Sequence, residues 1–572
     1  MSKNSAKKFS FKKFLKVLGK ILLCIAGVLL ILFIIFHKLV LDGFHLLKMS
    51  MVTVDPDALE YTEMHLTREQ MLTDFEYFYD HLYTDSFVRE EAERYLGLDY
   101  AKIHDEYEER ISNCKDEYEF YCLMMSLSAK LPGAHNCIQA PTNTVPDSYD
   151  FPLGYEVNAK EVIDSNYSFY VQFEDRMFSF DQKFMYFCYF GGDYVAISSD
   201  FDKDDLIPGI ENGRLLTLNG QNVEDVLDEI DTVQKYAYDA ACDRVFSCEL
   251  LFNDSYGKKY VAEIELPDGS IVTMDLYNSC EHVAACQFRN RLYPNHNSDQ
   301  DSDEDKPEEG VSSEQPQEIK RCYSIEKVPE RDLIVITIKM CDSNDIDAVR
   351  EDITNALNEV NPSCVIIDNR NNKGGAFTFV TDGLCPVLFN HDYEFVSYAR
   401  TPINDMTDML YGNSFYTRFF ENGLKREADH YCYNEDFSFK GEAARSYDIY
   451  LLNGLSTFSS GDILAGIFSQ QPEVTVIGNN THGEGFSGHP MNYYLPESKF
   501  IFSMTFSVSE AYPDDNYLGT VPDIYVANTW NEWLKKQELT DDPDCTVDLS
   551  SFEGRLMWDA VMIKTYELIE NK

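Results

Sequence analysis

Positive charge is scarce in this sequence, where 48 lysines and arginines face 98 aspartates and glutamates and the formal net charge is −50. A protein that grips nucleic acid through its phosphates needs a basic face, so this balance argues against a nucleic-acid partner. Apolar residues make up 44% of the 572 residues and aromatic residues 14%. That content is enough for two or three folded domains with hydrophobic cores.

Clustered cysteines are also absent, although the chain has fifteen. Secreted disulfide scaffolds are short and have closely spaced cysteines, whereas these lie in apolar runs such as 187–189 and 363–365. We therefore expect mostly buried free thiols, with a few disulfides as the alternative. No cysteine pair has zinc-ligand spacing, and His482, Glu484 and His489 on a glycine-rich loop match no helical zinc motif. We expect neither a metal nor a cofactor.

The positive charge that is present gathers at the N-terminus, where eight lysines and no acid precede Asp42. The lysines flank a long apolar run, which predicts a transmembrane anchor over 17–41 and a cytoplasmic basic tail over 1–16. A cleaved signal peptide is the alternative, but no small-x-small cleavage site closes the run. The sequence thus predicts a single-pass protein of the cell membrane, with the rest of the chain extracytoplasmic.

Hydrophobic patterning divides the remainder of the chain. Residues 55–150 have helical periodicity, and residues 151–290 contain short strands typical of a β-rich domain. Residues 291–320 are rich in Asp, Glu, Ser, Pro and Asn, which predicts a disordered acidic linker. Apolar strands alternate with helical stretches over 321–535, which indicates an α/β core with a parallel or mixed sheet, and 536–572 form a C-terminal extension. The predicted fold class is multidomain α/β.

Two segments of the α/β core carry residues suited to acyl transfer. Residues 365–375 indicate a buried strand that runs into a turn with adjacent glycines, and residues 455–463 indicate a strand end, a small-residue elbow around Ser459 and a helix start. Adjacent glycines let backbone N–H groups approach a ligand, and a serine at a helix start lies at the positive end of the helix dipole. Acyl-transfer enzymes need such a nucleophile and an oxyanion hole. The hole is predicted from backbone N–H groups of Gly374, Gly375 and Ser460.

Four motifs give the chain a family resemblance. Residues 365–375 resemble the strand and R-N-N-G-G turn of the C-terminal processing peptidases, or tail-specific proteases, and residues 457–462 resemble their S-A-S-A-S-E elbow. Residues 481–485 are similar to their T-F-G-K-G motif and 519–524 to G-V-x-P-D-I, in the family's order. Residues 212–223 are similar to a PDZ signature. The resemblance implies a PDZ-like domain at 151–290, a serine peptidase core at 321–535 related to the crotonase-like fold, and Ser459 as nucleophile.

One position departs from the family's pattern. The general-base lysine is replaced by Glu484, so Ser–Lys chemistry is not available, and a carboxylate would serve as base only with a suitable pKa. Residues 131–136 resemble the L-x-D-G-H-T motif of the tricorn-type relatives, which implies His135 as general base. Glu484 is then expected to be structural or to line the site. The carboxylate that orients His135 is placed at Asp515, with Asp514 and Asn516 as neighbouring alternatives.

The sequence therefore predicts a membrane-anchored, extracytoplasmic serine endopeptidase that cleaves peptide bonds through an acyl-enzyme. Its partner would be a polypeptide, held through its C-terminus or an unfolded segment by strand addition to the PDZ-like domain. Two alternatives stay open at this stage. One is a peptide-binding pseudoprotease that lost catalysis with its lysine, and the other is an esterase or amidase that acts on envelope material.

Overall fold

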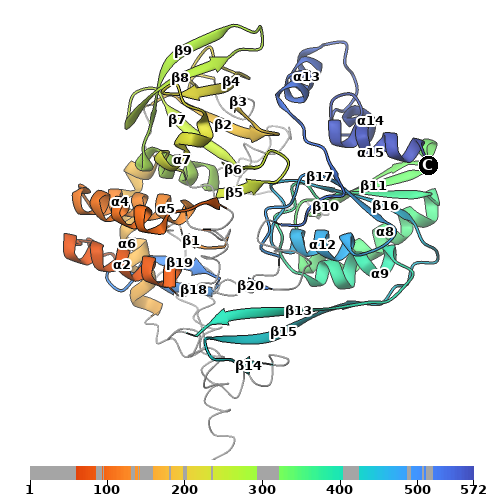
Figure 1. The fold of residues 1–572 in the computed structure, drawn as a ribbon, viewed down its shortest axis with the longest axis horizontal. Helices are drawn as coiled ribbons and strands as arrows, with labels where there is room; N and C mark the ends of the chain where they lie inside the picture. Colours follow the sequence, from red (N-terminus) through yellow and green to blue (C-terminus); the bar gives the residue numbers. More distant parts are fainter. Residues whose placement is uncertain are drawn as a thin grey trace, which may run out of the picture.

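A computed structural model describes residues 59–572, except for 85–92, 94–95, 131–134, 140, 142–158, 179–181, 198–202, 233–235, 293–320, 404–423, 486–490, 506–507 and 510–518. Figure 1 shows three parts: a helical region, a β-barrel beside it, and an α/β core. The multidomain α/β class is confirmed. The tail 1–16, the anchor 17–41 and nearly all of the linker 291–320 lie outside the described residues.

The expected membrane localisation is corrected by the structure. Within the part of the chain that the structure describes, none of the helices combines the length and the apolar character needed to cross a bilayer. Charged and polar side chains interrupt their apolar stretches, as in the helix Ala159–Phe178, so a continuous span of about 20 apolar residues does not occur there.

The described part of the helical region contains five helices, and amphipathic spacing explains the packing of one of them, Tyr100–Asn113. In Tyr100–Asn113 the buried residues Tyr100, Ile103, Tyr107 and Ile111 recur at helical intervals, and the side chain of Asp99 caps the first turn by accepting from the backbone N–H of Lys102. These side chains join one hydrophobic core that continues into the barrel. The helices are α2 (Arg68–Thr84), α4 (Tyr100–Asn113), α5 (Glu117–Lys130), α6 (Ala159–Phe178) and α7 (Cys280–Leu292).

A closed β-barrel follows, in the strand order β2-β3-β4-β8-β9-β7. Alternate residues of β8 are buried, as expected for a strand with one face toward a core and one toward solvent. A separate hairpin, β5 with β6, projects from this part. The strands are β2 (Phe184–Phe190), β3 (Asp193–Ile197), β4 (Arg214–Leu218), β5 (Tyr236–Asp239), β6 (Arg244–Ser247), β7 (Glu249–Asn253), β8 (Lys258–Glu265) and β9 (Ile271–Asn278). The PDZ-like character of this part stays a prediction.

The α/β core is built on a six-stranded sheet in the order β10-β11-β12-β16-β17-β21, parallel except for the β10–β11 pair. Both faces are buried. Val365 and Ile367 pack with the helices of one face, and Ile366 packs with C-terminal helices on the other. The strands are β10 (Tyr323–Val328), β11 (Leu333–Ile338), β12 (Cys364–Asp368), β16 (Asp448–Asn453), β17 (Val474–Gly478) and β21 (Ile524–Tyr525).

Helices cover the two faces of this sheet (Figure 1). On one face lie α8 (Ile346–Val360), the π-helical segment η6 (Phe379–Leu384), α9 (Cys385–Leu388) and α12 (Ser460–Ser469). On the other lie α14 (Phe552–Arg555) and α15 (Ala560–Glu570). The helix α13 (Trp530–Asp541) precedes them and contacts the barrel, where the ring of Trp533 stacks on Phe190.

Two small sheets connect the parts. β1 (Cys137–Ile138) pairs with β19 (Ile501–Met504), which pairs with β18 (Met491–Tyr494), so the end of the helical region is tied to a late segment of the chain. A second sheet, β14-β15-β13-β20, contains the long hairpin of β13 (Tyr393–Pro402) and β15 (His430–Phe439), with β14 (Lys425–Arg426) and β20 (Val508–Ser509). All fourteen cysteines from Cys114 to Cys545 are free thiols.

Candidate active site

Ser459 occupies a strained elbow between a strand and a helix. β16 ends at Asn453, and α12 begins at Ser460, so Ser459 is the N-cap residue of this helix. Its φ of 57° and ψ of −130° are unusual for a residue that is not glycine. Strained backbone of this kind persists only where the surroundings enforce it, and it is frequent at functional sites. Here the enforcement includes a hydrogen bond from the backbone N–H of Ser459 to Gly483 O at 3.2 Å.

The two glycines after β12 lie directly against this elbow. Gly374 has a φ of +85°, and a Cβ there would lie 2.6 Å from Ser459 Cβ and 2.9 Å from the backbone N of Ser460. Gly375 has a φ of +125°, and a Cβ there would lie 2.3 Å from Cys341 O. Only glycine fits either position. Because β12 and β16 are neighbouring parallel strands, their carboxyl ends bring both segments to one edge of the sheet.

The backbone N–H groups of this turn differ in their hydrogen bonding. Gly374 N–H donates to Asn372 Oδ1 at 3.0 Å, so it is already engaged. In the described part of the chain, the N–H groups of Gly375 and Ser460 have no acceptor. Ser460 Oγ donates to Gly375 O, which ties these two residues together. Of the three N–H groups that the sequence assigns to an oxyanion hole, those of Gly375 and Ser460 are therefore the two without an acceptor among the described residues.

Buried asparagines hold the glycine turn to the elbow. Asn369 Nδ2 donates to Gly461 O at 2.9 Å and to Asn453 Oδ1 at 3.1 Å. Asn372 Nδ2 donates to Asn369 Oδ1 at 2.9 Å, and the backbone O of Asn372 accepts from Phe458 N at 3.2 Å. These three side chains are almost completely shielded from water. The turn and the elbow thus form one rigid unit.

Asp462, in the first turn of α12, fixes the loop that follows β17. Its Oδ2 accepts the backbone N–H of Gly485 at 3.0 Å, and its Oδ1 accepts Thr520 Oγ1 at 2.9 Å and the hydroxyl of Thr481. Burial raises the pKa of Asp462 above its usual value, although these hydrogen bonds act in the opposite direction. The loop that carries Glu484 is therefore fixed to the first turn of α12, directly after the elbow.

His135 and Glu484 meet beside this elbow. His135 Nδ1 lies 2.9 Å from Glu484 Oε2, and the backbone N–H of His135 donates to the same oxygen at 3.0 Å. The Glu484 side chain is 6% exposed. Burial alone would raise the pKa of Glu484, but the contacts with His135 and the nearby His482 outweigh it and hold this pKa below its usual value. Glu484 is thus a buried carboxylate whose pKa is shifted away from the neutral range in which a general base works best.

The segment around His135 is anchored from both sides. Asn136 Oδ1 accepts the backbone N–H of Thr505 at 2.7 Å, and β1 then pairs with β19. The β18–β19 turn is held in its place by Asp74 of α2, whose carboxylate oxygens accept the N–H groups of Glu497 and Ser498 at 2.7 and 2.8 Å. Burial raises the pKa of Asp74 to about 6. The helical region therefore positions His135 through this chain of contacts.

Three basic side chains lie around the ring of Phe458, the residue directly before Ser459. The ring centroid of His135 lies 6.1 Å from that of Phe458, and the centroid of His482 lies 6.4 Å away. Lys373 Nζ lies 5.9 Å from the same centroid. His135 is thereby placed next to the residue that precedes Ser459.

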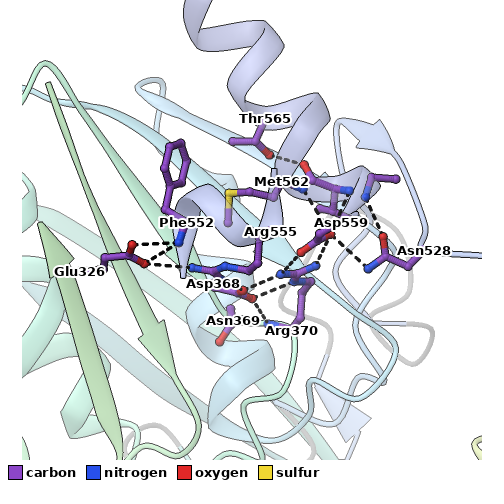
Figure 2. Close-up of polar contacts among 12 residues, drawn as sticks. Glu326, Asp368, Asn369, Arg370, Asn528, Phe552, Arg555, Asp559, Met562 and Thr565 are labelled. Atoms are coloured by element: carbon purple, nitrogen blue, oxygen red, sulfur yellow. Dashed lines mark hydrogen bonds and ion pairs between the residues drawn. The ribbon is translucent and has the colours of Figure 1, made fainter. Parts of the chain in front are cut away.

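Figure 2 shows how the end of the strand before the glycine turn is braced by the C-terminal helices. Arg370 lies between two carboxylates, with its Nη2 2.6 Å from Asp368 Oδ2 and 2.8 Å from Asp559 Oδ2 at the start of α15. Arg555 of α14 binds the same Asp368 oxygen at 2.8 Å. Burial opposes these charges, but the two arginines outweigh it and lower the pKa of Asp368, while the carboxylates raise that of Arg370.

The structure brings together most of the residues that the sequence singles out. Ser459, Ser460, Gly374 and Gly375 form the elbow and its turn, and His135 reaches the Glu484 loop. Asp515, Asp514, Asn516 and His489 lie outside the described residues. Sequence reasoning missed the contact between Glu484 and His135, although the replacement of the family's lysine by an acid was a signal for it. It also missed Asn372, Asp462 and Asp74.

Residues 332–526 match the family model described as "Peptidase family S41". No curated protein matches the chain. Among solved structures, mature CPAF complexed with lactacystin is similar at 13% identity and a TM-score of 0.47, covering 88% of this chain and 99% of its own. The photosystem II D1 C-terminal processing protease has 12% identity and a TM-score of 0.33, with 81% and 94% covered. The tricorn protease has 12% identity and a TM-score of 0.29, with 88% and 37% covered.

Proposed function

We propose that Ser459 is the nucleophile of this protein and His135 its general base. Through residues 332–526 the chain belongs to peptidase family S41, and the protein is accordingly a serine peptidase. Glu484 orients His135. The N–H groups of Gly375 and Ser460 form the oxyanion hole. The substrate is a polypeptide, and the reaction is hydrolysis of a peptide bond.

The observation that carries this proposal is the contact of Glu484 with Nδ1 of His135. The two atoms, Glu484 Oε2 and His135 Nδ1, lie 2.9 Å apart without forming a hydrogen bond in this structure, and a small rotation of the ring would let Nδ1–H donate to the carboxylate. In that arrangement Nε2 has the lone pair that accepts the serine proton. The same oxygen accepts the backbone N–H of His135, so the contact also fixes the position of the ring. In this proposal Glu484 has the orienting role that the sequence assigned to Asp515. Its contact with His135 supports a Ser–His mechanism over the alternative in which activity was lost together with the family's lysine.

The proposed reaction uses only groups of this chain. His135 Nε2 takes the proton from Ser459 Oγ as the oxygen attacks the peptide carbonyl, and the negative charge that develops on the carbonyl oxygen is stabilised by the two backbone N–H groups. His135 then gives the proton to the leaving amine. A water molecule, deprotonated by His135, releases the acyl group and restores the Ser459 hydroxyl.

The closed barrel constrains how a polypeptide is held. Each of its strands is paired on both sides, so strand addition of the PDZ type requires one pairing to open. The shortest pairings are the places for this, namely β7–β9 with the pair Asn253 and Tyr277, and β3–β4 with Tyr194 opposite Leu215 and Val195 opposite Arg214. Binding of the substrate's C-terminus or of an unfolded segment there remains part of the proposal.

A serine-directed fluorophosphonate probe tests the nucleophile. We expect labelling near neutral pH that is lost in Ser459→Ala and strongly reduced in His135→Ala. Ser469→Ala is the matched control, because it removes a hydroxyl from the other end of the same helix, where Ser469 Oγ donates to Gly466 O. Labelling that persists in Ser459→Ala would refute the assignment. Absence of labelling in the unmodified protein would favour a pseudoprotease, and labelling without peptide cleavage would favour an esterase or amidase.

A further inference from the structure

We propose that Lys373 recognises a carboxylate of the substrate close to the bond that is cleaved. This inference rests on the proposed function of the Ser459 site and adds a preference for acidic substrate groups. A suitable carboxylate is either the side chain of Asp or Glu or the C-terminal carboxylate of a polypeptide. The two sources share one chemistry, a carboxylate that meets an ammonium group.

The position of Lys373 is fixed by the glycine turn. Lys373 lies between buried Asn372 and Gly374, and its backbone N–H donates to Lys339 O at 3.0 Å. Its side chain is directed along the elbow, because Nζ lies 3.4 Å from Ser456 O and 5.9 Å from the ring centroid of Phe458. A cation over an aromatic ring is held in that place by the ring's electron-rich face. The ammonium group thus lies beside the residues that immediately precede Ser459.

Lys373 has no carboxylate partner among the described residues, although the chain has about twice as many acids as bases. Neighbouring Lys339 is exposed and is likewise without an ion pair in that part of the chain. The carboxylate in contact with the basic side chains around Phe458 is Glu484, which is buried and occupied by His135. Within the described residues, the rim of the nucleophile therefore carries a lysine without a paired acid, on a molecule whose net charge is −50. Such local inversion of charge attracts and orients an anionic group.

Two partly exposed apolar side chains lie close to Lys373 along the backbone. Met340 is 42% exposed and Phe377 is 37% exposed, and both flank the segment in which Cys341 pairs with Gly375. The Phe377 ring meets Phe437 edge-on, with centroids 5.8 Å apart. The apolar surface next to the ammonium group itself is the ring of Phe458, 5.9 Å from Nζ. The substrate feature that fits is an acidic group next to an apolar residue.

A peptide library cleaved by the protein tests this preference, with cleavage sites identified by mass spectrometry. We expect Asp and Glu to be enriched within about three residues of the cleaved bond. Lys373→Ala should reduce the rate for such sites about 10-fold relative to neutral sites, and Lys373→Glu should favour Lys and Arg instead. Amidation of the library's C-termini separates the two carboxylate sources, because it removes the preference only if the terminal carboxylate is recognised. Lys535→Ala on α13, an exposed lysine of the C-terminal segment, is the control for the loss of one charge.

A binding measurement separates failure of this inference from failure of the proposed function. Fluorescent peptides that carry Asp or Asn beside a phenylalanine, each with a free or an amidated C-terminus, are titrated onto the Ser459→Ala variant, which needs no catalysis. We expect the carboxylate-bearing peptides to bind more tightly and to lose that advantage in Ser459→Ala/Lys373→Ala and in high salt. Recognition of a carboxylate would be overturned if all the peptides bound equally well. It would also be overturned if Lys373→Ala lowered the cleavage rate equally at acidic and neutral sites. If the unmodified protein shows no Ser459-dependent cleavage while the Ser459→Ala variant still prefers carboxylate-bearing peptides, the peptidase mechanism alone is overturned.

Discussion

Glu484 contacts His135 twice through a single oxygen, across a separation of 349 residues in the sequence. Oε2 lies 2.9 Å from Nδ1 of the ring and accepts the backbone N–H at 3.0 Å. The first contact puts a negative charge beside the ring without a hydrogen bond to Nδ1, and the second holds the backbone of His135 in place. One carboxylate thus faces both the ring and the backbone of the proposed base.

Replacing Glu484 with glutamine should lower kcat/KM about 10²- to 10⁴-fold, because the amide cannot stabilise the imidazolium that forms when His135 takes the serine proton. Steady-state kinetics near neutral pH measure this loss. Glu473→Gln is the control, because it alters a second His–Glu contact, with His391 at 3.0 Å. Equal effects of the two substitutions would contradict an orienting role for Glu484.

Gly374→Ala should abolish activity by displacing the oxyanion turn from the elbow, since the added Cβ would lie 2.6 Å from Ser459 Cβ. Gly269→Ala is a matched control: its φ of +80° imposes a similar backbone strain, but a Cβ there meets nothing within 4 Å. Thermal unfolding and fluorophosphonate labelling should show destabilisation of about 1 kcal/mol or more in both variants and loss of labelling in Gly374→Ala alone. Full labelling of folded Gly374→Ala would contradict the proposed hole.

Asp559→Ala should destabilise the protein by about 3–5 kcal/mol, because it leaves Arg370 buried with one of its two carboxylates removed. Denaturant unfolding measures this loss. Glu229→Ala is the comparison: its 2.6 Å ion pair with Lys258 is half exposed, and its removal should cost about 1 kcal/mol or less. A small effect of Asp559→Ala would show that Asp368 alone satisfies the Arg370 guanidinium.

Asp74 should make the stability of the fold depend on pH in an unusual direction. Its pKa is raised to about 6 in the folded protein from 3.8, so the folded state binds this proton more tightly than the unfolded state. Its contribution is fully present below about pH 4 and is lost as the pH rises through about 6. Asp74→Asn should flatten this part of the pH–stability curve. Unfolding midpoints measured between pH 4 and 7.5 on both proteins test this, and identical curves would exclude Asp74 as the source.

The strand, turn and elbow were predictable from the sequence because their signals are local. Apolar runs give β12 and β16, and the residues at their ends give the glycine pair and Ser459. The partners of these residues were not predictable, since Asn372 engages Gly374 N–H through side-chain geometry that no pattern encodes. The acid beside His135 depends on which loop the tertiary fold carries there. Among the described residues it is Glu484, and Asp515 lies outside them, so its assignment stays a prediction. The apolar N-terminal run led to a membrane localisation that the described helices do not support.

The brace around Arg370 also bears on how the protein is made. Ser459, His135 and Glu484 are all synthesised before Asp559, which meets Arg370 at the start of α15. A nascent chain that has emerged only through residue 526 would hold every proposed catalytic group without this clamp. The ion pairs behind the glycine turn can therefore be completed only after the C-terminal helices have been synthesised.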